Sequence, residues 1–261
     1  MKAPIPSSIS SLPPEGVLPT LLKLNNVVVV GEDHTDHAAK RLLRETMPIL
    51  RQMKTSLAWE MVRSDNTEEK EDLRPDQTMV DRYIFQGDNK EQLRTAITKY
   101  CHDYGGNMVE EKMALLHAAR ENRVRIIGID KSCPDDWHRR IGNANPHWES
   151  VIRQHQKQGI GNIVMLVGKY HIHNINLYDE GAGDQATGID QLLGAPSLVV
   201  HTSTSQTPQL WQSSAGSPTA DVELRLPADY FLTSRGLGHG FAMKIILESI
   251  QQQMQKSPER H

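Results

Sequence analysis

Five polar residues interrupt or directly follow short apolar runs, and their types could carry out acid–base or metal chemistry. They are Glu32, His34, Glu60, Asp130 and His171. The runs are residues 27–30, 57–61, 124–129 and 163–167. In open α/β sheets, ligands bind at the carboxyl ends of the strands, beside the helices that follow. We therefore predict that these five side chains converge on one site.

Two histidines and two glutamates suit two kinds of chemistry, one with a bound metal and one without. The number of these side chains is compatible with both. His34, His171 and Glu60 could ligate a divalent metal that activates water, because imidazole and carboxylate are suitable ligands. Alternatively, a neutral histidine paired with a glutamate acts as a general base without metal. A helix predicted to begin at Thr35 would disfavour an imidazolium, so we expect His34 to be neutral.

Some of these residues also have a purely structural interpretation. A carboxylate such as Glu32 or Asp33 is stabilised at a helix N-terminus without any catalytic role. Glu60 is harder to explain in this way, because a carboxylate inside an apolar strand is costly unless it is paired. Arg63 is its nearest candidate for an ion pair.

Strand and helix patterns alternate along the chain. Besides the four runs above, we expect strands at 197–201, 221–226 and 228–232, and helices at 35–53, 76–85, 90–104, 107–122, 148–158 and 241–254. Pro48 should kink or break the first of these helices. The alternation predicts one α/β domain with a mostly parallel central sheet flanked by helices. Residues 221–226 alternate polar and apolar side chains, which suits an antiparallel edge.

Three segments are expected from the composition along the chain. Residues 1–24 form a Ser/Pro-rich leader that we expect to be disordered or draped on the surface, either as a ragged terminus or as a secretion signal. It lacks the apolar core of a Sec signal peptide. Residues 25–254 form the single α/β domain, and residues 255–261 form a tail.

The overall composition excludes several classes of protein. The chain has 261 residues, of which 38% are apolar and 23% charged, with a net charge of −3. No basic stripe with interleaved aromatic residues is present, so we do not expect a nucleic-acid partner. The two cysteines lack CxxC spacing, which argues against a zinc ribbon. No apolar stretch approaches the roughly 20 residues of a membrane span.

Five segments together resemble the erythromycin esterase/ChaN-like superfamily, which includes the TIKI/TraB proteases. They are VVVVGEDHTDHAAKRLL, LAWEM, MALLHAARENRVRIIGID, VMLVGKYH and PADYFLTSRG, within residues 25–235. Their order and spacing are more specific than any one of them. By this resemblance, the catalytic residues are Glu32, His34, Glu60 and His171. Substrate binding is assigned to three neighbours at strand ends: Asp130, Lys131 and Tyr170.

The resemblance implies several functions, because fold alone does not fix activity. Esterase-type members use the histidine and glutamates to activate water, TIKI-type members use a divalent metal, and ChaN-type proteins bind haem. The chain is expected to be a hydrolase acting on a small molecule or protein. Without a Sec signal, it is similar to type III secreted virulence effectors that act on host proteins and cause host cell death; the bacterial cytoplasm is the alternative location. The other functions are a haem- or iron-binding protein and a non-catalytic effector acting by protein contact.

Overall fold

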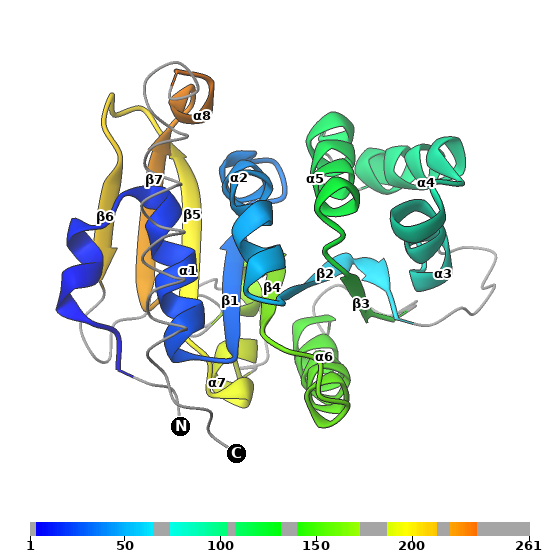
Figure 1. Cartoon of the computed structure of the whole chain (residues 1–261), viewed down its shortest axis with the longest axis horizontal. Coiled ribbons are helices and arrows are strands. Elements are labelled where there is room, and N and C mark those ends of the chain that lie inside the picture. Colours follow the sequence, from blue (N-terminus) through cyan, green and yellow to red (C-terminus); the bar gives the residue numbers. More distant parts are fainter. Residues whose placement is uncertain are drawn as a thin grey trace.

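A seven-stranded sheet organises the molecule, with its strands in the order β3-β2-β4-β1-β5-β7-β6 (Figure 1). The computed structural model describes residues 4–64, 74–103, 108–131, 140–172, 187–212 and 220–233. The strands are β1 (Val27–Glu32), β2 (Ser56–Arg63), β3 (Ile126–Asp130), β4 (Ile163–Gly168), β5 (Ser197–Ser203), β6 (Gln209–Gln212) and β7 (Val222–Pro227). Neighbouring strands from β3 to β7 are parallel, and β6 is antiparallel to β7. The predicted fold class, a mostly parallel α/β sheet with an antiparallel edge, is confirmed.

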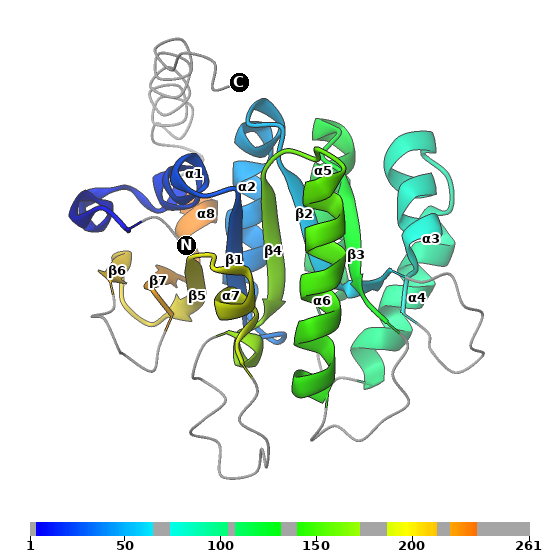
Figure 2. The same cartoon turned by 90° about the horizontal axis from the view of Figure 1, so that it is seen from below.

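Helices cover both faces of this sheet. They are η1 (Ser7–Ser11), α1 (Pro14–Leu24), α2 (Ala38–Gln52), α3 (Gln77–Asp81), η2 (Arg82–Gln86), α4 (Lys90–Asp103), α5 (Val109–Asn122), α6 (Arg140–Lys157), η4 (Lys169–His171), α7 (Ile189–Leu193) and α8 (Tyr230–Thr233). Figures 1 and 2 show α1, α2 and α5 on one face and α6 and α7 on the other. Each face has its own apolar core, because the buried parallel strands carry apolar side chains on both sides.

The position of the antiparallel edge differs from the sequence prediction. Residues 221–226 were expected at the edge, but β7 pairs in parallel with β5 and lies inside the sheet. The edge strand is β6, which lies between the predicted strands 197–201 and 221–226 and was not predicted. Alternation of polar and apolar residues indicates that one face of a strand is more exposed than the other. A strand inside the sheet can also have such a face.

The leader prediction is wrong for the described part of residues 1–24. After η1, the chain forms α1, whose Val17, Leu18, Leu21 and Leu22 lie in the same core as α2. Pro13 and Pro14 stand at the start of α1, where a missing N–H costs nothing. Prolines that suggest disorder by composition therefore begin a helix that belongs to the core.

Two other local predictions are corrected. Pro48 lies inside α2 without interrupting it. The segment 228–232 was expected to be a strand, but Tyr230–Thr233 is the short helix α8. The predicted helix 241–254 and the tail 255–261 lie outside the described residues.

One edge of the sheet is hydrogen-bonded to a side chain. The Gln77 amide, at the start of α3, donates from Nε2 to the carbonyl of Ile126 at 2.9 Å and accepts at Oε1 from the N–H of Gly128 at 2.6 Å. Both partners belong to β3, which has β2 as its neighbour in the sheet. A single glutamine thus satisfies a donor and an acceptor that the strand order leaves unpaired.

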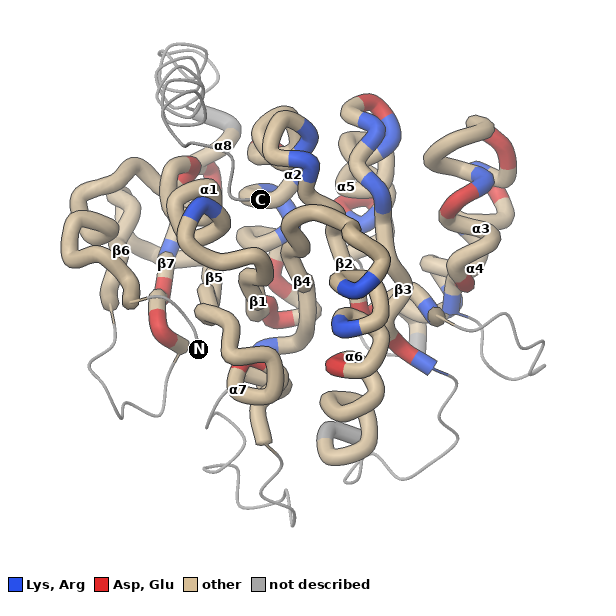
Figure 3. Tube along the Cα trace, turned by 60° about the horizontal axis from the view of Figure 1, so that its bottom comes forward, with Lys and Arg blue, Asp and Glu red and all other residues tan. Residues whose placement is uncertain are grey.

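Charges of both signs are spread over the molecule. In the described part of the chain, lysines and arginines lie on α1, α2, α5 and α6 among acidic residues (Figure 3). None of the helices described has the length and apolar character needed to cross a bilayer.

Candidate functional site

Three adjacent strands bring the central residues of the site together. β4 lies between β1 and β2, and Gly168 at the end of β4 is paired in register with Glu32 at the end of β1. Glu60 comes from β2, one position beyond the Trp59–Leu166 pair. This order places one carboxylate on each side of Gly168, with its small backbone between them.

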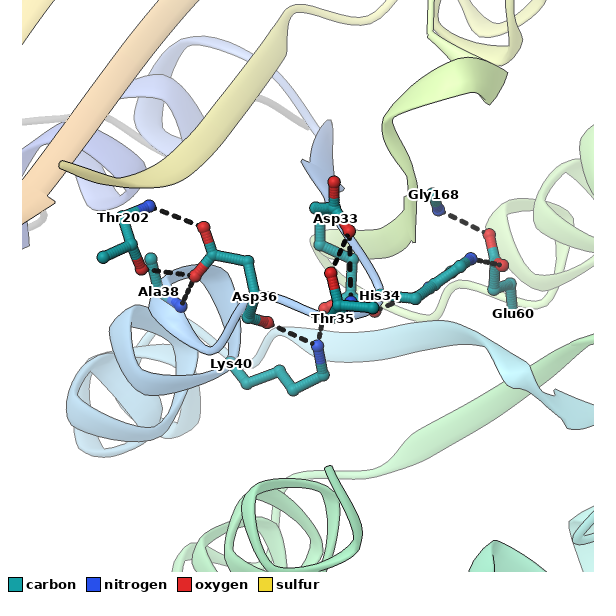
Figure 4. A network of polar contacts seen from close by, with 10 residues as sticks. Asp33, His34, Thr35, Asp36, Ala38, Lys40, Glu60, Gly168 and Thr202 are labelled. Carbon is teal, nitrogen blue, oxygen red and sulfur yellow. Dashed lines mark hydrogen bonds and ion pairs between the residues drawn. The ribbon is translucent and has the colours of Figure 1, made fainter. Parts of the chain in front are cut away.

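His34 bridges the two carboxylates. Its Nδ1 lies 3.2 Å from Oε1 of Glu32, and its Nε2 lies 3.0 Å from Oε1 of Glu60 (Figure 4). The carboxylates are almost completely buried, whereas 32% of the His34 side chain is exposed. The structure therefore brings Glu32, His34 and Glu60 together, and the imidazole is the most exposed of the three side chains.

His34 is positively charged, whereas the sequence suggested a neutral histidine. Burial alone would lower the pKa of His34, but the carboxylates of Glu60 and Glu32 outweigh it and raise the pKa to about 10. The helix argument fails because α2 begins at Ala38, so His34 does not lie in its first turn. His34 is therefore an imidazolium at neutral pH and not the neutral base that the sequence suggested.

Lys40 completes the charge balance of the cluster, and sequence reasoning missed it. Its Nζ lies 2.6 Å from Oε2 of Glu32, and both side chains are fully buried. Burial would raise the pKa of Glu32, but Lys40 and then His34 hold it below its ordinary value. The sequence did contain a signal, because Lys40 has helical spacing with three core residues: Leu43, Met47 and Leu50. A charge in that stripe indicates a buried partner.

Gly168 contributes both a donor and space. Its N–H donates to Oε2 of Glu60 at 2.6 Å, which fixes the second carboxylate oxygen (Figure 4). A Cβ at position 168 would lie 3.0 Å from Nε2 of His34, closer than ordinary packing. The close approach of the histidine therefore favours glycine at this position. Glu60 thus contacts both His34 and the backbone of Gly168.

Two aspartates hold the loop that carries His34. Asp33 accepts from the N–H and hydroxyl of Thr35, and its other oxygen lies 3.1 Å from Nζ of Lys169. Asp36 accepts from the N–H of Ala38 at 2.8 Å and from the N–H of Thr202 on β5 at 2.6 Å (Figure 4). Asp36 thus satisfies the N–H of Ala38, the first residue of α2. The loop is consequently tied to β5 and η4.

His171 packs against α6, on the face of the sheet that α6 and α7 cover. It is buried, its Nδ1 lies 2.7 Å from Oδ1 of Asn145, and its ring lies 4.3 Å from that of Trp148. Asn145 donates from Nδ2 to the carbonyl of Thr187 at 2.9 Å. The amide oxygen therefore faces His171, which makes Nδ1 the protonated nitrogen. Asn145 was missed, although it shares helical spacing with Trp148 and Ile152 in the apolar stripe of α6.

The three residues assigned to substrate binding have different surroundings. Asp130 is buried and ion-paired with Arg74, and it accepts from Nε1 of Trp148 at 3.3 Å. Lys131 is half-buried, and its carbonyl accepts from Arg74 at 2.9 Å. Tyr170 is 45% exposed, with the Lys169 ammonium 5.4 Å from its ring centre. Only Tyr170 presents a large part of its side chain to solvent.

The described residues do not fit a metal or a haem as they stand. Within the parts of the chain that the structure describes, no three His, Cys, Asp or Glu side chains are arranged to hold a metal ion. Both nitrogens of His34 face carboxylates, so neither offers a lone pair to iron or to a divalent metal. His171, predicted as a second ligand, is buried against Trp148 and Asn145.

No protein-family model and no curated protein sequence matches this chain. Solved structures do share its fold. The type III effector HopBA1 superposes with a TM-score of 0.58 and 16% identity, over 85% of this chain and 99% of that one. A structure of bacterial protein toxins gives 0.54 and 18%, over 74% of this chain and 37% of that one.

A third structure is the C-terminal region of Pasteurella multocida toxin, described as containing a thiol-protease-like catalytic triad. Its TM-score is 0.53 at 13% identity, over 82% of this chain and 28% of that one. The chain thus spans less than half the length of the two toxin structures. At these identities the likeness shows that bacterial effectors and toxins share this fold, and function must be argued from the site.

Proposed function

We propose that this chain is a hydrolase of the erythromycin esterase/ChaN-like superfamily that acts as a virulence effector in host cells after type III-like secretion. The sequence motifs quoted above support the superfamily, and the fold shared with HopBA1 supports an effector. The proposed substrate is a small molecule or a host protein with an acyl group that water can attack.

The observation that carries the hydrolase proposal is the position of His34. A half-buried imidazolium lies between two buried carboxylates, and part of it remains open to solvent. Burying ionised carboxylates costs free energy because they lose their hydration. A cluster of buried charges with a strongly shifted pKa is typical of a functional site. The exposed cation is suited to stabilise negative charge that develops on a substrate oxygen.

The geometry supports a complete path for the protons. Glu60 takes a proton from a water molecule whose oxygen attacks the acyl carbon, and His34 gives its Nε2 proton to the leaving group as the acyl bond breaks. The proton on Glu60 then crosses the 3.0 Å contact to Nε2 of His34, which restores the starting charges. Glu32 keeps the imidazole oriented through Nδ1 during this cycle.

Tyr170 and Lys169 are the proposed contacts for substrate at the rim of this cluster. They follow Gly168 directly, and Lys169 is linked to Asp33 on the loop that carries His34. Asp130 and Lys131 remain proposed substrate contacts, although the ion pair with Arg74 gives Asp130 a structural role as well.

The test is hydrolysis of a panel of p-nitrophenyl esters and fluorogenic peptides by the purified protein. Glu60→Gln and His34→Asn should each lower the rate by roughly 10²–10⁴-fold, the usual contribution of a positioned acid or base. Glu149→Gln makes the same chemical change on α6, away from the cluster, and should retain the rate. Equal rates in the wild type and both cluster variants would exclude the assigned centre.

A further inference from the structure

Lys40 is a buried cation that the proton path does not use. Its side chain is fully buried, with Nζ 2.6 Å from Oε2 of Glu32 and 2.9 Å from the carbonyl of Asp36. An ammonium inside a protein is costly unless it is paired and hydrogen-bonded. Since an apolar residue would fill the same stripe of α2 at lower cost, the position of Lys40 requires an explanation.

The two oxygens of Glu32 have different partners. Oε2 faces Lys40, and Oε1 lies 3.2 Å from Nδ1 of His34. The ammonium therefore fixes the rotation of the carboxylate, and the carboxylate fixes the ring of His34. We infer that Lys40 is a positioning residue of the site, acting on His34 through Glu32. An effect of Lys40 on catalysis rests on the proposed function. The contacts by which Lys40 orients Glu32 and His34 do not depend on it.

Lys40 also balances the charge of the cluster. Glu32 and Glu60 carry two negative charges, and His34 and Lys40 carry two positive ones. Without Lys40, two buried carboxylates would share one cation, and protonation of Glu32 would relieve the imbalance. A protonated Glu32 holds the imidazolium less strongly, so removal of Lys40 should disturb His34 without a direct contact between the two.

Lys112 provides a matched control. It is a second buried lysine, on α5, and it faces the same region: burial lowers its pKa, and Lys40 lowers it further. Glu32 attracts the Lys112 ammonium and raises its pKa, but this effect is smaller than those of burial and Lys40. Replacing either lysine by methionine removes a buried charge, but only Lys40→Met removes the contact with the carboxylate.

The first measurement is a pH titration that gives the pKa of the Glu32 carboxyl from its ¹³C NMR signal. It is made on three full-length proteins: the wild type, Lys40→Met and Lys112→Met. Lys40→Met should raise that pKa by roughly one to three units, the effect of an opposite charge at this range. Lys112→Met should change it by less. The imidazole ¹⁵N signals of His34 should also shift in Lys40→Met. An unchanged Glu32 pKa, or equal shifts in both variants, overturns the inference.

Two further measurements keep the inference testable. If Lys40→Met does not fold, the ammonium of Lys40 is observed in the wild type instead. It should give a slowly exchanging ¹⁵N signal that Glu32→Gln abolishes. A fast-exchanging ammonium overturns the inference. With an active substrate, Lys40→Met should lower kcat with little change in KM and move the acidic limb of the pH profile upward. Shifted NMR signals in a protein without hydrolysis would refute the proposed function alone, whereas hydrolysis unaffected by Lys40→Met would refute the inference alone.

Discussion

At the scale of single residues, the two carboxylates that His34 contacts decide its charge. The sequence placed Glu32 and Glu60 correctly, because a carboxylate at a buried strand end is conspicuous among apolar neighbours. It could not give the charge of His34, which depends on β1 and β2 lying on either side of β4. Lys40 was overlooked for the same reason: its partner, Glu32, is visible only once the helix is packed on the sheet.

The pH dependence of stability provides a first test at this scale. Folding raises the pKa of His34 from 6.5 to about 10. Its contribution to stability is therefore complete below pH 6.5 and is lost as the pH rises through about 10. The urea midpoint of the wild type should fall over this range by more than that of His34→Asn. Parallel pH profiles for the two proteins would show that His34 is not held as a cation.

Gly168→Ala should displace His34 without removing any ionisable group. The new Cβ would lie 3.0 Å from Nε2 of His34, so the imidazole must shift by a few tenths of an ångström. A misplacement of about 1 Å costs about 10²-fold in rate, so this smaller shift should lower the rate by less than about 10²-fold, measured with the substrate that the ester and peptide panel identifies. Gly16→Ala in α1 is the control, because its Cβ would have its nearest neighbour at 3.7 Å. A full rate in Gly168→Ala would contradict the described packing.

At the scale of elements, the pattern of apolar residues predicted most strands of the sheet. Local composition gave a wrong prediction where packing against the rest of the molecule determines the structure. The strands at 27–30, 57–61 and 163–167 were found within a few residues of their bounds. In contrast, α1 was missed because proline and serine suggested disorder, although its apolar residues fall on one face. The short turn η4 places His171 against Asn145 of α6, a contact that the sequence pattern did not predict.

A pair of substitutions in α1 tests whether this helix belongs to the core. Leu18 is fully buried, whereas Leu24 in the last turn is 43% exposed. Leu18→Ala should lower the free energy of unfolding by about 2–5 kcal/mol, and Leu24→Ala by less than about 0.5 kcal/mol. Chemical denaturation measures both values. Similar small losses would favour the surface-draped leader predicted from composition.

At the scale of the whole molecule, the fold is shared with HopBA1 and with parts of larger toxins, but the reaction is not thereby fixed. A sheet of this order presents three adjacent strand ends on which different polar residues can be placed. In this chain, the described centre is a charge-balanced group of four side chains: Glu32, His34, Lys40 and Glu60. The proposed activity in host cells must therefore depend on that group.

Expression in host cells separates catalysis from action by contact. If the protein acts as a hydrolase, cell death caused by the wild type should be lost with Glu60→Gln and retained with Glu149→Gln at equal protein levels. The reason is that Glu60 receives the proton of the attacking water, whereas Glu149 lies on the surface of α6. Cell death that persists with Glu60→Gln would instead favour a non-catalytic effector.

The glutamine at the start of α3 has a consequence beyond its two hydrogen bonds. A strand at the border of a sheet offers unpaired amides and carbonyls to any other extended chain, which is a common route to polymerisation. Gln77 occupies the donor of Gly128 and the acceptor of Ile126, where an incoming strand would pair. An extended chain approaching this border of the sheet would therefore have to displace the Gln77 amide before it could pair with β3 at these two positions.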